Sequence, residues 1–211
     1  MPEIEIKICG LSTPEAVDAA VAARATHIGL VHYPPSPRHV TLEEAAALRA
    51  RVPHGTKVVL LLVNEQPQPT ALAIQAVRPD VVQFHGTETP EWLALLRQNT
   101  PLEIWKAIGV SGTDNLERAQ RYKGAAHMLL YDAPAKKLPG GTGLSFDWSL
   151  LTSFKHTMPW GLAGGLTPAT VGEAIRMTGA QLVDTSSGVE SAPGIKDTAK
   201  IAAFCRAARE A

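Results

Sequence analysis

The chain has 211 residues, and 20 Lys and Arg residues balance 20 Asp and Glu residues, so the formal net charge is zero. This length is enough to bury a full core, and we expect one catalytic domain over residues 1–211. The neutral balance indicates no nucleic-acid partner, and no apolar stretch approaches the roughly 20 residues that span a bilayer, so we also expect no membrane partner.

Eight short apolar runs alternate with amphipathic segments along the chain, and we predict a strand at each run. The run at 57–63 reads Lys-Val-Val-Leu-Leu-Leu-Val. Such continuous apolar character is typical of parallel strands that are buried on both faces. The predicted strands lie near residues 4–9, 27–32, 57–63, 80–85, 103–108, 126–131, 159–163 and 181–185.

Helices are predicted between these strands, and several have explicit start signals. Thr13, Thr89 and Thr167 each precede a proline. A threonine hydroxyl can cap the start of a helix, and proline suits the first helical position because the N–H group there has no partner within the helix. Thr41 is followed three residues later by Glu44, which fits a capping box.

The alternation of eight strands with helices predicts an α/β protein with a closed (βα)8 barrel, also called a TIM barrel. The helix before the seventh strand should be short, because only residues 146–154 are available for it. A doubly wound open sheet is the alternative. It is disfavoured because the glycine-rich segments lie late in the chain and not after the first strand.

The two longest irregular segments, 33–40 and 132–145, each follow a predicted strand. In a barrel this places them on the catalytic face, where loops carry function. Residues 134–143 combine two lysines with several glycines, which is the makeup of a lid that closes over a ligand. A solvated surface loop is the alternative.

Small residues follow the seventh and eighth predicted strands. Gly164 and Gly165 follow one strand, and Ser187 and Gly188 follow the other. Glycine lets the backbone approach a ligand closely, and unpaired N–H groups favour an anion. In a barrel this is the expected place for a phosphate site, after strands 7 and 8. Ordinary tight turns are the alternative, which would be preferred if only one such pair were present.

Two reactive side chains fall at predicted strand ends. Cys9 ends the first strand, and Asp132 follows the sixth. A buried free cysteine usually serves only as a small apolar residue, and as a base it would have to become a thiolate. A carboxylate at the end of an apolar strand loses hydration unless it is paired or protonated, so Asp132 is a candidate general acid.

Further polar groups are expected at the same barrel mouth. Three prolines stiffen the loop that carries Arg38, whose planar guanidinium suits a substrate carboxylate. Gln83 and His85, near the end of the fourth strand, are expected to form hydrogen bonds there. The histidines show no metal-ligand spacing, so we expect no metal.

The cysteine content indicates the compartment. Cys9 and Cys205, at opposite ends of the chain, do not make a disulfide framework. The N-terminal segment 1–7 carries acidic residues where a signal peptide would be basic and then apolar. We therefore expect a cytoplasmic protein, and a monomer, with a homodimer as the alternative.

Together these motifs resemble the phosphoribosylanthranilate isomerase family, the (βα)8 enzymes of tryptophan biosynthesis. They follow the family order along nearly the whole chain. The matching segments are Lys7-Ile-Cys-Gly10, Ser36-Pro-Arg38, Val82-Gln-Phe-His-Gly86, Asp132, Gly140-Gly-Thr-Gly143, Phe146-Asp-Trp148, Leu162-Ala-Gly-Gly-Leu166, Val183-Asp-Thr-Ser-Ser-Gly-Val-Glu190 and Gly194-Ile-Lys-Asp197.

The resemblance implies specific roles. The family's thiol base corresponds to Cys9, and its carboxylic general acid corresponds to Asp132. Arg38 would hold the anthranilate carboxylate, and Asp184 would lie near the sugar hydroxyls. Gly164, Gly165, Ser187 and Gly188 would form the phosphate cup. The segments 31–32 and 61–64 lack the aromatic residues expected from the family, which concerns the wall of the pocket.

The implied reaction is the Amadori rearrangement of N-(5-phosphoribosyl)anthranilate to 1-(2-carboxyphenylamino)-1-deoxyribulose 5-phosphate, with a phosphosugar substrate and no cofactor. One alternative is a bifunctional barrel isomerase that also rearranges the aminoaldose phosphate of histidine biosynthesis. Those enzymes carry an aspartate at the position of Cys9. The other alternative is a non-catalytic phosphosugar-binding barrel, which the presence of both Cys9 and Asp132 disfavours.

Overall fold

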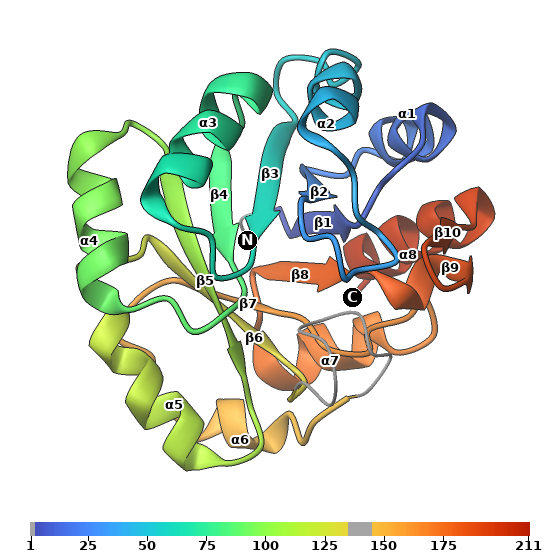
Figure 1. Ribbon diagram of the computed structural model, residues 1–211. Helices are drawn as coiled ribbons and strands as arrows, with labels where there is room; N and C mark the ends of the chain where they lie inside the picture. Colours follow the sequence, from blue (N-terminus) through green and yellow to red (C-terminus); the bar gives the residue numbers. More distant parts are fainter. Residues whose placement is uncertain (1–2, 135–144) are drawn as a thin grey trace.

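Eight parallel strands close into a barrel in the computed structural model, which describes residues 3–134 and 145–211 (Figure 1). Each strand pairs with the next one in the chain, and β1 also pairs with β8, which closes the ring. The predicted fold class is therefore confirmed. The strands are β1 (Glu5–Cys9), β2 (His27–Val31), β3 (Lys57–Leu62), β4 (Val81–Phe84), β5 (Glu103–Gly109), β6 (Met128–Asp132), β7 (Trp160–Leu162) and β8 (Leu182–Thr185).

Helices surround the barrel and connect successive strands (Figure 1). The hydroxyls of Thr13 and Thr89 cap α1 and α4 as predicted, and Thr41 with Glu44 forms the predicted capping box at α2. The α-helices are α1 (Pro14–Ala22), α2 (Leu42–Arg49), α3 (Pro67–Val77), α4 (Pro90–Asn99), α5 (Thr113–Ala119), α6 (Ser149–Thr152), α7 (Val171–Thr178) and α8 (Thr198–Arg209).

The prediction for the start of α7 was wrong. The helix begins at Val171 with Thr170 at its N-cap, and not after Thr167. The backbone N–H of Thr167 donates to the Thr170 hydroxyl at 3.0 Å, and the Thr170 N–H donates to the Thr167 carbonyl at 3.1 Å. The segment therefore closes into a turn before the helix starts. The sixth helix, in contrast, is as short as predicted.

The core has two layers. The larger layer lies between the strands and the helices and contains, for example, Ile6 of β1 and Phe204 of α8. The smaller layer fills the inside of the barrel with strand side chains such as Val59, Trp105 and Leu182. Because side chains alternate along a strand, residues two apart share one layer. Each strand can therefore pack helices on one side and still send polar groups into the barrel.

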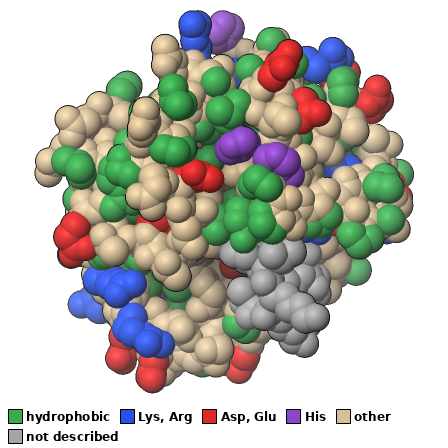
Figure 2. Space-filling model, viewed as in Figure 1, with side chains coloured by type: hydrophobic (Ala, Val, Ile, Leu, Met, Phe, Trp, Pro, Cys, Tyr) green, Lys and Arg blue, Asp and Glu red, His purple; other side chains and the backbone are tan. Residues whose placement is uncertain are grey.

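Two short elements follow β8. A 3₁₀ helix, η2 (Ser187–Val189), leads into an antiparallel hairpin of β9 (Glu190–Ala192) and β10 (Ile195–Lys196), which lies beside α8 (Figure 1). No helix within residues 3–134 and 145–211 is long and apolar enough to cross a membrane. Figure 2 shows acidic and basic side chains interspersed around the margin of one face, in keeping with the zero net charge.

Candidate active site

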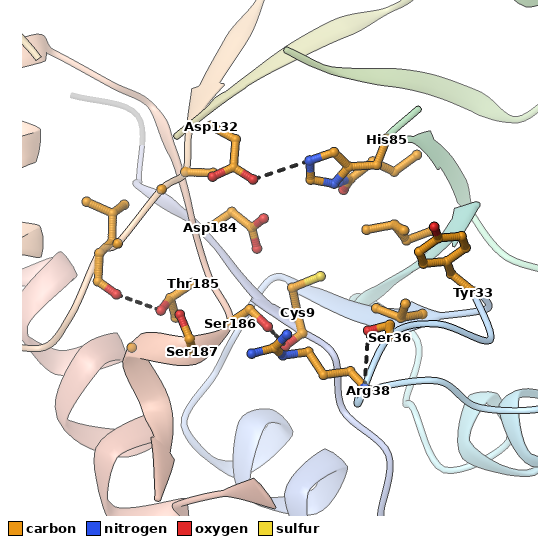
Figure 3. Close-up of a pocket in the computed structure, with 18 of the residues that line it drawn as sticks. Cys9, Tyr33, Ser36, Arg38, His85, Asp132, Asp184, Thr185, Ser186 and Ser187 are labelled. Carbon is orange, nitrogen blue, oxygen red and sulfur yellow. Dashed lines mark hydrogen bonds and ion pairs between the residues drawn. The ribbon is translucent and has the colours of Figure 1, made fainter. Parts of the chain in front are cut away.

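A pocket opens at the carboxyl ends of the strands (Figure 3). The lining contains every site residue predicted from the sequence: Cys9, Arg38, Gln83, His85, Asp132, Gly164, Gly165, Asp184, Ser187 and Gly188. The predicted lid, residues 134–143, lies almost entirely outside the described residues.

Cys9 is the last residue of β1, and its side chain enters the pocket (Figure 3). The residue is only 5% exposed, and the Ser186 hydroxyl donates to its carbonyl oxygen at 3.1 Å. Burial raises the pKa of the Cys9 thiol, while the ammonium group of Lys7 acts in the opposite direction. The thiol is therefore the favoured form, and any thiolate formed from it is a strong base.

Asp184 lies on β8, opposite Lys7 of β1 in the strand register. The Lys7 Nζ atom donates to Asp184 Oδ1 at 3.0 Å, and both side chains are buried. Burial raises the pKa of the Asp184 carboxyl, and Lys7 opposes that shift. Asp184 lines the pocket, whereas Lys7 lies beneath it and is fully buried.

Asp132 ends β6 and is held by two contacts. Its Oδ1 atom accepts from the backbone N–H of Ala133 at 2.7 Å, and its Oδ2 atom lies 3.3 Å from His85 Nε2 (Figure 3). A Cβ atom on Gly164 would lie 3.2 Å from Asp132 Oδ1. The carboxyl group is thus adjacent to the glycine loop that follows β7.

The loops after β7 and β8 form the candidate phosphate cup. Gly164 and Gly165 both have positive φ angles, 85° and 66°, which side-chain-bearing residues rarely adopt. At Gly188, an added Cβ atom would lie 1.9 Å from the Leu166 carbonyl oxygen, because the two loops touch there. The Thr185 hydroxyl also donates to that oxygen, at 2.7 Å. This close packing leaves a concave wall of backbone and small polar groups.

Arg38 belongs to a buried ion cluster at the pocket, beside Ser186 (Figure 3). Its Nε and one terminal nitrogen donate to the two carboxylate oxygens of Glu190, at 2.7 and 2.8 Å. Lys196 Nζ donates to Glu190 Oε1 at 2.8 Å. Burial works to raise the pKa of Glu190, but Arg38 and Lys196 outweigh it and lower the pKa. Two cations against one carboxylate leave net positive charge beside the pocket.

Gln83 and His85 supply polar atoms from the β4 side. Gln83 is fully buried, and neither its side-chain nitrogen nor its oxygen has a hydrogen-bond partner within the part of the chain that the structure describes. The same holds for His85 Nδ1. Buried polar atoms without partners are costly, and in a pocket lining they can be satisfied by a ligand.

Apolar residues complete the wall between β1 and β4. Val31, Leu61 and Val63 line the pocket and pack with Cys9 and partly buried Tyr33. These positions include the segments where the sequence lacks the expected aromatic residues. An aromatic ring could lie against this aliphatic surface without burying a polar group.

Sequence reasoning missed the partners of the predicted residues. Lys7 was noted only as part of a motif, and Ser186, Glu190 and Lys196 were given no role. The signal for Lys7 is its spacing, since it lies two residues before Cys9 on a strand and so shares the same face. The sequence holds no comparable signal for the pairing of Glu190 with Arg38.

Comparisons with known proteins identify one family to which this chain is similar. A family model described as N-(5'phosphoribosyl)anthranilate (PRA) isomerase matches residues 6–207. N-(5'-phosphoribosyl)anthranilate isomerase of Erythrobacter litoralis is 65% identical over 206 residues, covering 98% of this chain and 99% of the relative. That of Paramagnetospirillum magneticum is 47% identical over 209 residues, covering 98% and 97%.

Solved structures agree with the sequence relatives. The crystal structure of phosphoribosyl anthranilate isomerase from Thermotoga maritima has a TM-score of 0.91 at 32% identity, covering 99% of this chain and 100% of the other. A crystal structure of such an isomerase in complex with reduced 1-(o-carboxyphenylamino)-1-deoxyribulose 5-phosphate has a TM-score of 0.86, with the same identity and coverage.

Proposed function

This chain belongs to the N-(5'-phosphoribosyl)anthranilate isomerase family, and we propose that Asp132 protonates the ring oxygen of the substrate and that Cys9 removes the proton from C2. The enzyme acts in tryptophan biosynthesis, where it converts the aminoaldose N-(5'-phosphoribosyl)anthranilate to the aminoketose 1-(2-carboxyphenylamino)-1-deoxyribulose 5-phosphate. The observation that carries the proposal is that a thiol and a carboxyl group, from β1 and β6, line one pocket together (Figure 3).

In the first step the carboxylic acid of Asp132 gives its proton to the furanose ring oxygen. The bond between that oxygen and C1 breaks, and the nitrogen lone pair forms an iminium ion with C1. The contacts of Asp132 with His85 and Ala133 fix the carboxyl group in one orientation. Such fixed placement of an acid within reach of its proton acceptor is what general acid catalysis requires.

In the second step the thiolate of Cys9 removes the proton from C2, and the electrons of that C–H bond form the enolamine. Protonation at C1 and loss of the enol proton then give the ketone. Since the pKa of the Cys9 thiol is raised by burial, only a fraction is thiolate at neutral pH. The iminium acidifies the neighbouring C–H group, so a modest amount of base is sufficient.

Two anion sites would hold the substrate between these groups. The glycine loops after β7 and β8, with Gly164, Gly165, Ser187 and Gly188, form the phosphate cup. Arg38, with the net positive charge of its ion cluster, attracts the anthranilate carboxylate. Gln83, His85 and Asp184 offer hydrogen bonds to the sugar hydroxyls between them. Anchoring both ends aligns the reacting atoms with the acid and the base.

The proposal is tested by following the fluorescence of N-(5'-phosphoribosyl)anthranilate as the enzyme consumes it. We expect Cys9→Ala and Asp132→Asn to lower kcat by about two to four orders of magnitude, as for other general acids and bases. Binding of the reduced product analogue should remain, because Asp132→Asn preserves the shape of the side chain. Cys205→Ala is the matched control, since Cys205 is also a buried free thiol but lies on α8.

Activity of either variant within a few-fold of the wild type would show that its assigned role is wrong. Assaying the aminoaldose phosphate of histidine biosynthesis in parallel tests the bifunctional alternative, for which comparable rates are expected.

We further propose a cytoplasmic monomer. Both cysteines are free, and the large exposed apolar side chains of the described residues lie on separate elements: Leu72, Leu95, Met177 and Ile195.

A further inference from the structure

We propose that Lys7 is a positioning residue for this reaction: its ammonium group, enclosed beneath the pocket floor, fixes the Asp184 carboxylate and favours the thiolate form of Cys9. The inference rests on the proposed role of Cys9 as the base. It assigns a function to a fully buried charged group that the mechanism above does not otherwise use.

The position of Lys7 follows from the strand geometry. Lys7 and Cys9 are two residues apart on β1, so both side chains point into the barrel, with Lys7 one layer deeper. Lys7 is 0% exposed and is not part of the pocket lining. It therefore cannot touch a substrate, and any effect on the reaction must pass through the groups above it.

Lys7 contacts one of those groups directly and acts on the other through its charge. Its Nζ atom lies 3.0 Å from Asp184 Oδ1, and Cys9 is two residues further along the same face of β1, where the ammonium charge of Lys7 favours the thiolate. Burial works to lower the pKa of Lys7, but the Asp184 carboxylate and, when it is ionised, the Cys9 thiolate outweigh it, so the pKa is raised and the ammonium stays protonated. A positive charge that persists beneath a thiol stabilises the thiolate.

No other charge in the described barrel interior replaces Lys7. Its register neighbour on β2 is His27, whose pKa burial lowers to about 3, so that ring is neutral. The other charged or titratable groups around the Cys9 thiol come from the loops and from other strands: Tyr33, Arg38, His85, Asp132, Asp184 and Lys196. Lys196 also favours the thiolate, but less than Lys7 does, and both Lys196 and Arg38 are shared with the Glu190 carboxylate.

A purely structural ion pair is the competing explanation, and the chain offers a comparison. Lys106 on β5 is also buried and lies 3.3 Å from Glu88, but it is not part of the pocket lining. Loss of Lys106 should lower stability without changing the pKa of the Cys9 thiol. Loss of Lys7 should lower stability and also raise that pKa. The titration of Cys9 therefore separates a positioning role from a structural one.

The test measures alkylation of Cys9 by iodoacetamide against pH, in a Cys205→Ala background so that only one thiol is followed. We expect Lys7→Met to lower the alkylation rate at neutral pH by about tenfold or more, corresponding to about one unit in the pKa of Cys9. The acidic limb of the kcat/KM profile should move to higher pH. Lys7→Arg, which keeps the charge, should restore part of the rate.

The control is Lys106→Met, which should leave the alkylation profile unchanged. If Lys7→Met does not fold, Lys7→Met with Asp184→Asn is compared with Asp184→Asn as its parent, because Asp184 itself raises the pKa of Cys9. A folded Lys7 variant whose alkylation profile superimposes on that of the parent would overturn the inference. Because alkylation does not depend on turnover, this result is distinct from failure of the proposed function, which Cys9→Ala reports.

Discussion

At the scale of single residues, Gly188 shows how closely the phosphate cup is packed. Its φ angle is not in the left-handed region, so the requirement for glycine is one of space. A side chain there would collide with the Leu166 carbonyl, and that backbone oxygen already accepts the Thr185 hydroxyl. The contact joins the loop after β7 to the loop after β8, so disturbing it should move both halves of the cup.

We therefore predict that Gly188→Ala raises KM at least tenfold with a smaller effect on kcat, because the anchor is displaced while the acid and base are not. The overpacking should also lower the free energy of unfolding by about 1–3 kcal/mol. Steady-state kinetics and urea unfolding measure the two effects. Gly112→Ala is the control, since its Cβ would meet no atom within 4 Å. An unchanged KM in Gly188→Ala would place the phosphate elsewhere.

Single residues also show which parts of the site could be predicted from the sequence and which could not. Cys9 and Asp132 could be located because apolar runs mark the strands, and closure brings all carboxyl ends to one rim. The partners of these residues could not be located. Glu190 is 152 positions from Arg38, and the sequence contains no pattern that pairs them. Such a contact depends on how two loops fold over the rim, and local propensity does not determine that.

At the scale of elements, the β9–β10 hairpin supports the loop that carries Arg38. Gly194 packs so closely that an added Cβ would lie 2.4 Å from the Pro37 carbonyl oxygen, and its φ angle of 82° favours glycine. Glu190 at the start of β9 holds the Arg38 guanidinium by two hydrogen bonds. Lys196 on β10 contacts the same carboxylate. The hairpin therefore determines where the positive charge lies.

We predict that Glu190→Gln weakens substrate binding, because the amide cannot accept both hydrogen bonds from Arg38. The expected result is a KM increase of about tenfold and a loss of about 3–5 kcal/mol in stability, since two buried cations lose their counter-charge. Steady-state kinetics and urea unfolding report these changes.

The matched control for that variant is Glu103→Gln. Glu103 also pairs with a lysine, Lys57, but both side chains are about two-fifths exposed and lie at the amino ends of their strands, away from the pocket. Exposed pairs contribute little, so stability should change by less than about 1 kcal/mol and KM should not change. Equal effects of the two substitutions would show that the hairpin does not position Arg38.

The helix starts show which structural features the local sequence determines and which it does not. The caps at Thr13, Thr41 and Thr89 form as predicted, because each depends on residues within three positions. Thr167 has the same local signal before a proline, yet its backbone bonds to Thr170 instead. That segment also has to bring Leu166 against the loop after β8, and this tertiary contact outweighs the capping preference.

At the scale of the whole molecule, closing the barrel buries polar side chains inside it. His27 begins β2, is 1% exposed, and packs against Trp105 with ring centroids 5.1 Å apart. Its Nδ1 atom bonds the Thr26 hydroxyl at 2.8 Å. Burial first, and then the charges of Lys57 and Lys7, lower the pKa of the ring to about 3. The folded barrel therefore binds this proton far more weakly than the unfolded chain does.

We predict that acid destabilises the protein through this residue. The unfolded ring takes up a proton below pH 6.5, while the folded ring stays neutral down to about pH 3, so stability falls as the pH falls through that window. From pH 7 to pH 5 the loss should be about 2 kcal/mol, a sizeable part of a typical total of about 5–15 kcal/mol. Urea unfolding at the two pH values measures it.

The decisive measurement is the pH slope of stability and not its absolute value, because His27→Gln also disturbs packing against Trp105. The variant should lose less stability than the wild type between pH 7 and pH 5. Carboxylates with lowered pKa values, such as Glu190 and Glu103, lose their contribution only below about pH 4.5, so they do not interfere. His127→Gln serves as control, since His127 is partly exposed and its pKa is also lowered. If His27→Gln leaves the pH slope of the wild type unchanged while His127→Gln reduces it, acid sensitivity comes from the surface and not from the closed barrel.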